Sequence, residues 1–177
     1  MTEFMMMGLL PDIASDLSVS IPEAGYLISS YALGVVIGAP LLVLIAGNFP
    51  PKKLLIGLMV LFTVFNGLSI IVPSYNLFLV TRLLSGLPHG AFFGVGAVVA
   101  GKLAKQGKEA SAIAIMFSGL TFANIVGIPL GTYVGQSISW RYSFLIVAAI
   151  GLLAILSLIF WMPKIEKNEG EKPKEGL

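Results

Sequence analysis

Long runs of apolar residues, separated by short polar connections, dominate the chain. Five of the runs hold the roughly 20 apolar residues that a membrane-spanning helix needs, and an N-terminal run holds about half a span before Asp16. None shows the strict alternation of a membrane barrel strand. Since a helix satisfies its own backbone hydrogen bonds in lipid, the pattern predicts an all-α membrane protein. The expected spans are approximately 1–15, 24–46, 54–72, 77–101, 110–135 and 140–162.

Composition supports a protein of the lipid bilayer and excludes several other classes. Hydrophobic residues make up 56% and charged residues 11% of the chain, and the mean hydropathy is +0.93; soluble domains carry about 25% charged residues. The net charge of +2 is too small to favour a nucleic-acid partner. The chain has no cysteine and one histidine, which excludes thiolate and multi-histidine metal sites. No cofactor is expected, and no catalytic pair or dyad indicates an enzyme.

Basic residues predict the orientation of the bundle. They follow alternate spans, and cytoplasmic loops carry an excess of lysine and arginine. The C-terminal tail, 164–177, is charged and has no apolar face, so a disordered cytoplasmic linker is expected there. Arg141 is the exception at an outer helix end, where an interfacial anchor with its tip in water is expected. The orienting lysines are Lys52, Lys53, Lys102, Lys105, Lys108, Lys164, Lys167, Lys172 and Lys174.

The two ends of the chain have an unusual pattern. The first run is interrupted by Pro11 and Asp12 and is too short for a complete span. A signal peptide is disfavoured because no basic n-region is present and Glu3 lies near the start. With a truncated first helix and a trailing linker, the chain is expected to be a fragment.

The stretch 80–94, VTRLLSGLPHGAFFG, places charge inside a span. A charged group at a bilayer centre costs at least about 2.5 to 3.5 kcal/mol, so Arg82 is a functional candidate. His89 lies seven residues further on and returns to within about 20° of the same helix face. Gly86, Gly90 and Gly94 recur every four residues beside them, which indicates a smooth stripe for close helix packing.

Five stretches of the chain match a known pattern: TEFMMMGLLPDIASDLSVS, AGYLISSYALGVVIGAP, RLLSGLPHGAFFG, GLTFANIVGIPLGTYVG and WRYSFL. Together they resemble the major facilitator superfamily, specifically the N-terminal half of its 12-helix drug/proton antiporters and arabinose- or sugar-efflux members. The resemblance implies a six-helix bundle in a prokaryotic inner or plasma membrane. It also implies proton-coupled efflux of a drug, sugar or nucleoside, with protons, a small-molecule substrate and a C-terminal six-helix half as partners.

The resemblance assigns coupling roles on the first and fourth helices. Arg82 matches the family's fourth-helix arginine, which lines the cavity and tunes proton coupling; snorkelling to the interface is the structural alternative. Glu3 is the expected acidic partner of Arg82, unless it only begins a solvated helix end. His89 either titrates or hydrogen-bonds a neighbouring helix.

Further candidates follow from the same resemblance. The GIPLGT stretch resembles the antiporter motif of the fifth helix, although packing alone would explain its glycines. The loop GNFPPKKLL departs from the family signature, which puts the latch of that signature in doubt. The candidates are Gly119, Gly127, Pro129 and Gly131 in the antiporter helix; Asn48, Lys52 and Lys53 in the cytoplasmic loop; Tyr31, Met7 and Asn124 in the substrate cavity; and Asp12 in gating. The alternatives are hydrogen bonds between helices for Tyr31 and Asn124, lipid or core contact for Met7, and interfacial solvation for Asp12.

Two other functions remain open from the sequence. The chain is either a membrane interaction protein that associates through its glycine faces and transports nothing, or a half-transporter that self-assembles. The DNA on both sides of the reading frame distinguishes these from a fragment.

Overall fold

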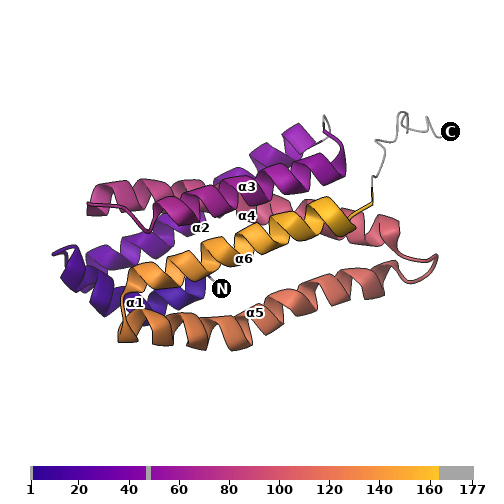
Figure 1. The fold of residues 1–177 in the computed structure, drawn as a ribbon. Coiled ribbons are helices and arrows are strands. Elements are labelled where there is room, and N and C mark those ends of the chain that lie inside the picture. The colour runs from indigo at the N-terminus through magenta and orange to yellow at the C-terminus, as the bar shows by residue number, and fades with distance from the viewer. Residues whose placement is uncertain (1, 47–48, 164–177) are drawn as a thin grey trace.

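The computed structural model describes residues 2–46 and 49–163, which form six helices. They lie in one elongated bundle, with α5 along one edge (Figure 1). Five of them are long and apolar enough to cross a membrane, whereas α1 is not. The predicted all-helical membrane fold is therefore confirmed, and the predicted tail at 164–177 lies outside the described residues. The helices are α1 (Thr2–Asp16), α2 (Ile21–Ala46), α3 (Pro51–Leu68), α4 (Tyr75–Leu103), α5 (Glu109–Ser137) and α6 (Trp140–Trp161).

Local hydrogen bonds define the turn between α1 and α2. Ser18 has a φ of 54°, and Val19 N–H donates to the Ala14 carbonyl, which closes α1 with a Schellman motif. Ser20 and Glu23 then form a capping box: the Glu23 carboxylate accepts from the backbone N–H and hydroxyl of Ser20, and Glu23 N–H donates to the Ser20 hydroxyl. This cap explains why α2 begins at Ile21 and not at the expected residue 24.

The helix α3 ends at Leu68, earlier than the expected residue 72. Ser69 is buried at its C-cap, and its hydroxyl lies 3.0 Å from the Phe65 carbonyl and 3.2 Å from the Thr81 hydroxyl, the two acceptors for its one proton. The bond to Thr81 joins α3 to α4, so the end of α3 is determined by a contact between helices. A run of apolar residues cannot reveal such a contact.

The closest packing in the bundle joins α2 to α4, the pair with the most extensive contact. A Cβ added at Gly34 would collide with the Leu83 carbonyl, and one added at Gly86 would collide with the Tyr31 carbonyl. The glycines therefore let two backbones approach where no side chain fits. Of the predicted stripe, Gly90 also faces α2, whereas Gly94 has no atom within 4 Å of an added Cβ.

The hydrophobic core lies around α1. Met5, Met6, Leu9 and Ile13 of α1 are fully buried. They belong to one cluster with Phe78, Trp140 and Phe144. In it the Phe78 ring stacks on Trp140 at 5.0 Å and meets Phe144 edge-on at 5.6 Å. Along α5, only Gly131 and Gly135 are classed as buried. The half of the bundle that contains α1 is thus well packed, and α5 is its most exposed helix.

Candidate functional site

Arg82 of α4 lies at the meeting point of four helices. Its side chain has no exposed surface. The guanidinium carbon lies 4.2 Å from the centre of the Tyr31 ring in α2 and 5.8 Å from that of Phe144 in α6. Nη2 donates to the Thr2 carbonyl of α1 at 3.5 Å. The snorkelling alternative requires the guanidinium to reach the membrane interface, whereas the structure buries it among four helices.

The hydrogen bonding of this guanidinium is incomplete. Nε and Nη1 of Arg82 have no hydrogen-bond partner among the described residues. A buried charge without partners costs several kcal/mol, of which a desolvated cation–π contact recovers about 2 kcal/mol. The two rings therefore compensate only part of this cost. The two donor nitrogens without a partner, Nε and Nη1, can still bind a hydrogen-bond acceptor.

Tyr31 connects Arg82 to the only histidine of the chain. Its hydroxyl lies 2.8 Å from His89 Nδ1 and accepts from the Thr2 hydroxyl at 3.4 Å. The His89 ring also packs against Phe93, with ring centres 5.1 Å apart. Tyr31 is fully buried. Its place between the two candidate coupling residues agrees with the alternative of a hydrogen bond between helices, and its role in a substrate cavity stays a prediction.

Glu3 lies next to this cluster but does not form the expected ion pair. It is half-buried in the first turn of α1, and no ion pair joins it to Arg82 in the described part of the chain. The carbonyl of the preceding residue, Thr2, takes the arginine hydrogen bond instead. A main-chain acceptor therefore occupies the place where the carboxylate was expected.

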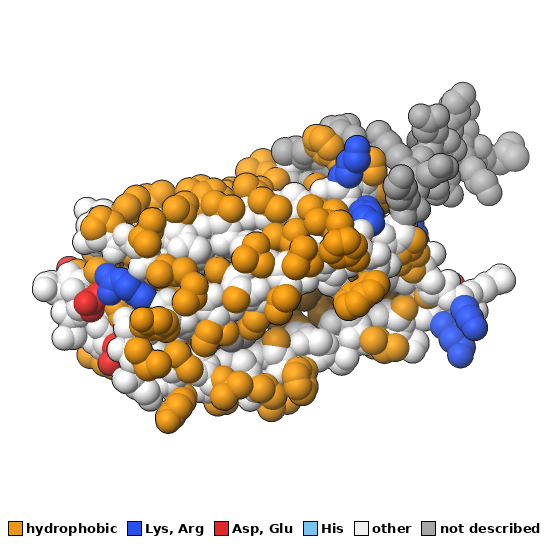
Figure 2. Space-filling view, in the orientation of Figure 1, with side chains coloured by type: hydrophobic (Ala, Val, Ile, Leu, Met, Phe, Trp, Pro, Cys, Tyr) orange, Lys and Arg blue, Asp and Glu red, His pale blue; other side chains and the backbone are white. Residues whose placement is uncertain are grey.

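A cavity of about 350 Å³ lies beside the polar cluster, and Figure 2 shows a hollow between the upper helices and α5. His89 and Gly119 are the predicted candidates on its lining. Tyr31, Met7 and Asn124 are not among the lining residues: Met7 is 55% exposed on α1, and Asn124 is half-buried on α5. The lining is almost entirely apolar: Thr2, Leu58, Met59, Phe62, Pro88, His89, Phe92, Phe93, Gly119, Leu120, Ala123, Val147, Ile150, Gly151 and Ala154.

The small residues of α5 have different environments along the helix. Gly131 and Gly135 are buried, and the Ser143 hydroxyl of α6 donates to the Gly131 carbonyl at 2.6 Å. Gly127 is half-buried and Pro129 is exposed, whereas an added Cβ at Gly119 would meet nothing within 4 Å. Packing accounts for Gly131 and Gly135, and Gly119 borders the cavity.

The predicted cytoplasmic-loop residues also differ from one another. Asn48 lies outside the described residues. The Lys52 ammonium donates to the Ile159 carbonyl at 2.8 Å and to the Met162 carbonyl, so it caps the C-terminal end of α6. Lys53 is exposed, and Asp12, the gating candidate, is half-buried beside Pro11.

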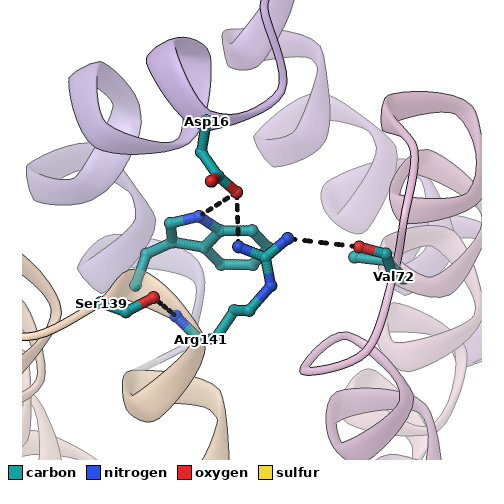
Figure 3. Close-up of polar contacts among 5 residues, drawn as sticks. Asp16, Val72, Ser139 and Arg141 are labelled. Carbon is teal, nitrogen blue, oxygen red and sulfur yellow. Dashed lines mark hydrogen bonds and ion pairs between the residues drawn. The ribbon is translucent and has the colours of Figure 1, made fainter.

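The sequence did not predict a polar cluster at the end of the bundle where α1 ends and α6 begins (Figure 3). Arg141 forms an ion pair with Asp16 of α1, its guanidinium carbon lies 4.3 Å from the centre of the Trp140 ring, and Nη2 donates to the Val72 carbonyl at 3.4 Å. The Trp140 indole N–H donates to the same Asp16 oxygen at 3.1 Å. The hydrogen bond from Arg141, supported by that of Trp140, lowers the pKa of Asp16.

The interfacial anchor expected at Arg141 stays a prediction, and the structure adds a contact between helices that is made by Arg141. Its side chain is only 31% exposed, and it joins α6 to α1 and to the connection after α3. The available signal in the sequence was the opposite charge of Asp16 and Arg141 at two helix ends predicted on the same side of the membrane. The expected anchor is thus part of a contact between helices.

Comparison with known proteins assigns the family. Residues 1–177 match the Major Facilitator Superfamily. The chain is 51% identical over 163 residues to the inner membrane transport protein YdhP of Escherichia coli K12, 40% identical over 156 residues to the MFS-type transporter YtbD of Bacillus subtilis 168, and 33% identical over 162 residues to a chloramphenicol resistance protein of Streptomyces lividans. These alignments cover 92%, 88% and 92% of the chain but only 42%, 39% and 41% of the relatives. The six-helix bundle is thus consistent with half of a major facilitator fold, and the chain belongs to the major facilitator superfamily, a family of multi-pass membrane transporters rather than enzymes.

Proposed function

We propose that the chain is the N-terminal half of a proton-coupled exporter, with Arg82, His89 and Glu3 as its coupling residues. The observation that carries the proposal is the buried Arg82, whose Nε and Nη1 lack partners among the described residues. Charged groups inside membrane spans are rare and commonly belong to ion or substrate pathways. Tyr31 lies between this charge and His89, so the two candidates share one contact residue.

Glu3 supplies the proton-dependent step in this proposal. Its carboxylate belongs to the same helical turn as Thr2, whose carbonyl already accepts from Arg82. A small rotation of α1 brings the ionised carboxylate to the unpaired donors of Arg82, and protonation removes that attraction. Proton binding then changes how α1 packs against α4. The bundle moves against the C-terminal half around a site near the membrane midplane.

Export of a drug, sugar or nucleoside is the proposed direction and substrate class. It is supported by the resemblance of the fifth-helix stretch to antiporters, and by the relative from Streptomyces lividans that is named a chloramphenicol resistance protein. Met7 is exposed on α1 and is proposed to line a site shared with the other half, together with Asn124 of α5. The proposed location is a prokaryotic inner or plasma membrane, with the tail in the cytoplasm.

The test measures substrate efflux from proteoliposomes that contain the full-length transporter under an imposed pH gradient. Arg82→Ala should reduce gradient-driven efflux at least about tenfold, equivalent to about 1.4 kcal/mol, because the buried charge is removed. Efflux by Arg82→Lys should lie between that of Arg82→Ala and that of the unchanged protein, since an ammonium group keeps the charge but does not reproduce the planar stacking on Tyr31. Lys105→Gln, at an exposed position outside the candidate site, serves as the control. Undiminished efflux by a well-expressed Arg82→Ala protein contradicts the coupling role.

Glu3→Gln tests the acidic partner separately. The variant should still bind substrate but lose the dependence of efflux on pH, because glutamine does not ionise. An unchanged pH profile removes Glu3 from the coupling site while leaving the result for Arg82 intact.

A self-assembling half-transporter is the second candidate. It is favoured by α5, a 29-residue helix in which only Gly131 and Gly135 are classed as buried, since such a face is available to another copy. Reconstitution of the chain alone distinguishes the candidates. Flux without any C-terminal half assigns self-assembly, and the absence of flux both alone and with a C-terminal half supports the interaction protein.

A further inference from the structure

Four buried side-chain atoms of the described residues have no hydrogen-bond partner, and all of them lie on α3 and α4. They are Thr63 Oγ1, Asn66 Oδ1, Arg82 Nε and Arg82 Nη1. Asn66 and Arg82 have no exposed surface, and Thr63, one turn before Asn66, is 7% exposed. Buried polar groups are nearly always satisfied by the protein or by ordered water, so a partner is expected for these atoms.

The contacts between α3 and α4 place Asn66 and Arg82 at a similar level of the bundle. The Ser69 hydroxyl of α3 lies 3.2 Å from the Thr81 hydroxyl of α4. The two helices follow each other through a short connection and run in opposite directions (Figure 1). Asn66 lies three residues before Ser69, and Arg82 follows Thr81 directly. Both residues therefore lie on the same side of that contact, within about one turn of it.

The same faces of α3 and α4 line the cavity. Asn66 follows the lining residue Phe62 by four residues, and its Nδ2 donates to the Phe62 carbonyl at 2.8 Å. Arg82 precedes the lining residue His89 by seven. Residues at these spacings share a helix face. Since Arg82 Nη2 donates to the carbonyl of Thr2, which also belongs to the lining, both residues lie at the end of the cavity that Thr2 borders.

Contacts with α6 direct the two side chains to one junction. A Cβ added at Gly67 would lie 4.0 Å from the Ala148 Cβ, so the residue after Asn66 faces α6 at that level. Phe144 lies about one turn from Ala148, and its ring centre is 5.8 Å from the guanidinium carbon of Arg82. Asn66 therefore lies on the face of α3 between its contacts with α4 and α6, where the guanidinium is buried.

The unpaired atoms of Asn66 and Arg82 have complementary chemistry. The guanidinium nitrogens only donate hydrogen bonds, and the Asn66 amide oxygen only accepts them. No direct hydrogen bond joins these atoms in the part of the chain that the structure describes. A water molecule both accepts and donates, and a buried water typically makes about three hydrogen bonds to groups that otherwise lack a partner. The cavity of about 350 Å³ beside these residues leaves room for it.

We propose that Asn66 and Arg82 hold an ordered water molecule between α3, α4 and α6. The water accepts from the guanidinium and donates to Asn66 Oδ1, which makes Asn66 a positioning residue for Arg82. The bond from Nδ2 to the Phe62 carbonyl fixes the orientation of the amide. Because the guanidinium contacts only water on this side, a carboxylate that arrives there can displace it. The proposal concerns how Arg82 is held and does not depend on proton coupling.

Nuclear magnetic resonance of the ¹⁵N-labelled chain in micelles tests for this water. The chain has two arginines, so comparison with Arg141→Lys assigns the guanidinium N–H signals of Arg82. These protons should show a rotating-frame cross-peak to water that is opposite in sign to chemical exchange. Asn66→Leu should remove the cross-peak, and Asn76→Leu, at an exposed position of α4, should leave it unchanged. Absence of the cross-peak from the unchanged chain, or its persistence in Asn66→Leu, overturns the proposal.

Asn66→Asp gives a second readout, the thermal midpoint of unfolding. Aspartate keeps an acceptor at this position and adds a negative charge, which should pair with the guanidinium directly or through the water. The midpoint of Asn66→Asp should therefore exceed that of Asn66→Leu by about 5 °C or more. In a chain that also carries Arg82→Gln the order should reverse, because the carboxylate is then buried without an opposite charge. The same order with and without Arg82→Gln overturns the shared site.

Discussion

Replacement of Gly86 by alanine is expected to loosen the contact between α2 and α4. The added Cβ would collide with the Tyr31 carbonyl and would lie 3.1 Å from the Val35 amide nitrogen and 3.2 Å from the Gly34 Cα. All three neighbours are backbone atoms of α2, so no side-chain rotation relieves the clash. The two helices have to move apart, and the Tyr31 ring beneath Arg82 moves with them.

The magnitude follows from two opposing effects. Overpacking at a well-packed position costs about 1 to 3 kcal/mol, and a rigid backbone neighbour favours the upper end. Alanine recovers about 1 kcal/mol of helix propensity relative to glycine. Gly94 is the matched control on the same helix: it is exposed, nothing lies within 4 Å of an added Cβ, and only the favourable effect applies. Gly94→Ala should therefore be more stable than Gly86→Ala by about 1 to 3 kcal/mol.

Equilibrium unfolding in mixed micelles, followed by the loss of helical circular dichroism, measures this difference. Both variants are compared with the unchanged chain at the same detergent concentration. Equal free energies of unfolding for Gly86→Ala and Gly94→Ala would refute the reasoning, since they would mean that α2 and α4 are not in backbone contact at Gly86.

Two further predictions concern the ends of the bundle. Asp16→Asn should lower the free energy of unfolding by up to about 1 kcal/mol at neutral pH, because the Arg141 ion pair is 31% and 43% exposed. The pKa of Asp16 is lowered in the folded state, so this contribution is present above the ordinary carboxyl pKa and is lost as the pH falls through the lowered value. The free energies of unfolding of the two proteins should therefore become equal at acid pH. A difference that stays constant with pH would contradict this. Lys52→Gln should destabilise the C-terminal end of α6 by about 0.5 to 1.5 kcal/mol, seen as faster amide exchange near Met162, whereas Lys53→Gln should have no such effect.

The sequence predicts the helices well because lipid leaves the backbone few alternatives. An apolar run of sufficient length has to satisfy its own N–H and C=O groups, so span 140–162 and helix α6 nearly coincide. The ends are less predictable, since they depend on specific polar contacts: Ser20 with Glu23 starts α2 early, and Ser69 with Thr81 ends α3 early. The first of these is a local pattern that sequence reasoning missed, and the second requires knowledge of which helices are neighbours.

The candidate site shows the same limit more sharply. Arg82 can be identified from the sequence because a charge inside a membrane span costs free energy. The search for an opposite charge then leads to Glu3 as its partner. In the structure Arg82 contacts two aromatic rings and a backbone carbonyl. Aromatic residues and backbone carbonyls occur throughout the chain, so the sequence does not mark the particular ones that contact Arg82. Tyr31 was accordingly expected on a cavity lining, although it is the residue that joins the two candidates.

Tyr31→Phe separates the two contacts that Tyr31 makes. Phenylalanine keeps a ring beneath Arg82 but removes the hydroxyl that lies 2.8 Å from His89 Nδ1. Because Thr2 donates to the Tyr31 oxygen, the tyrosine proton is available to Nδ1, and the proton of His89 is expected on Nε2. Since His89 is the only histidine, its imidazole ¹⁵N resonances report this bond without assignment by mutation. They should show the Nε2–H form in the unchanged chain and shift in Tyr31→Phe but not in Tyr133→Phe, at a position 70% exposed. A spectrum unaffected by Tyr31→Phe would show that Arg82 and His89 are not joined through Tyr31, and coupling between them would then need another route.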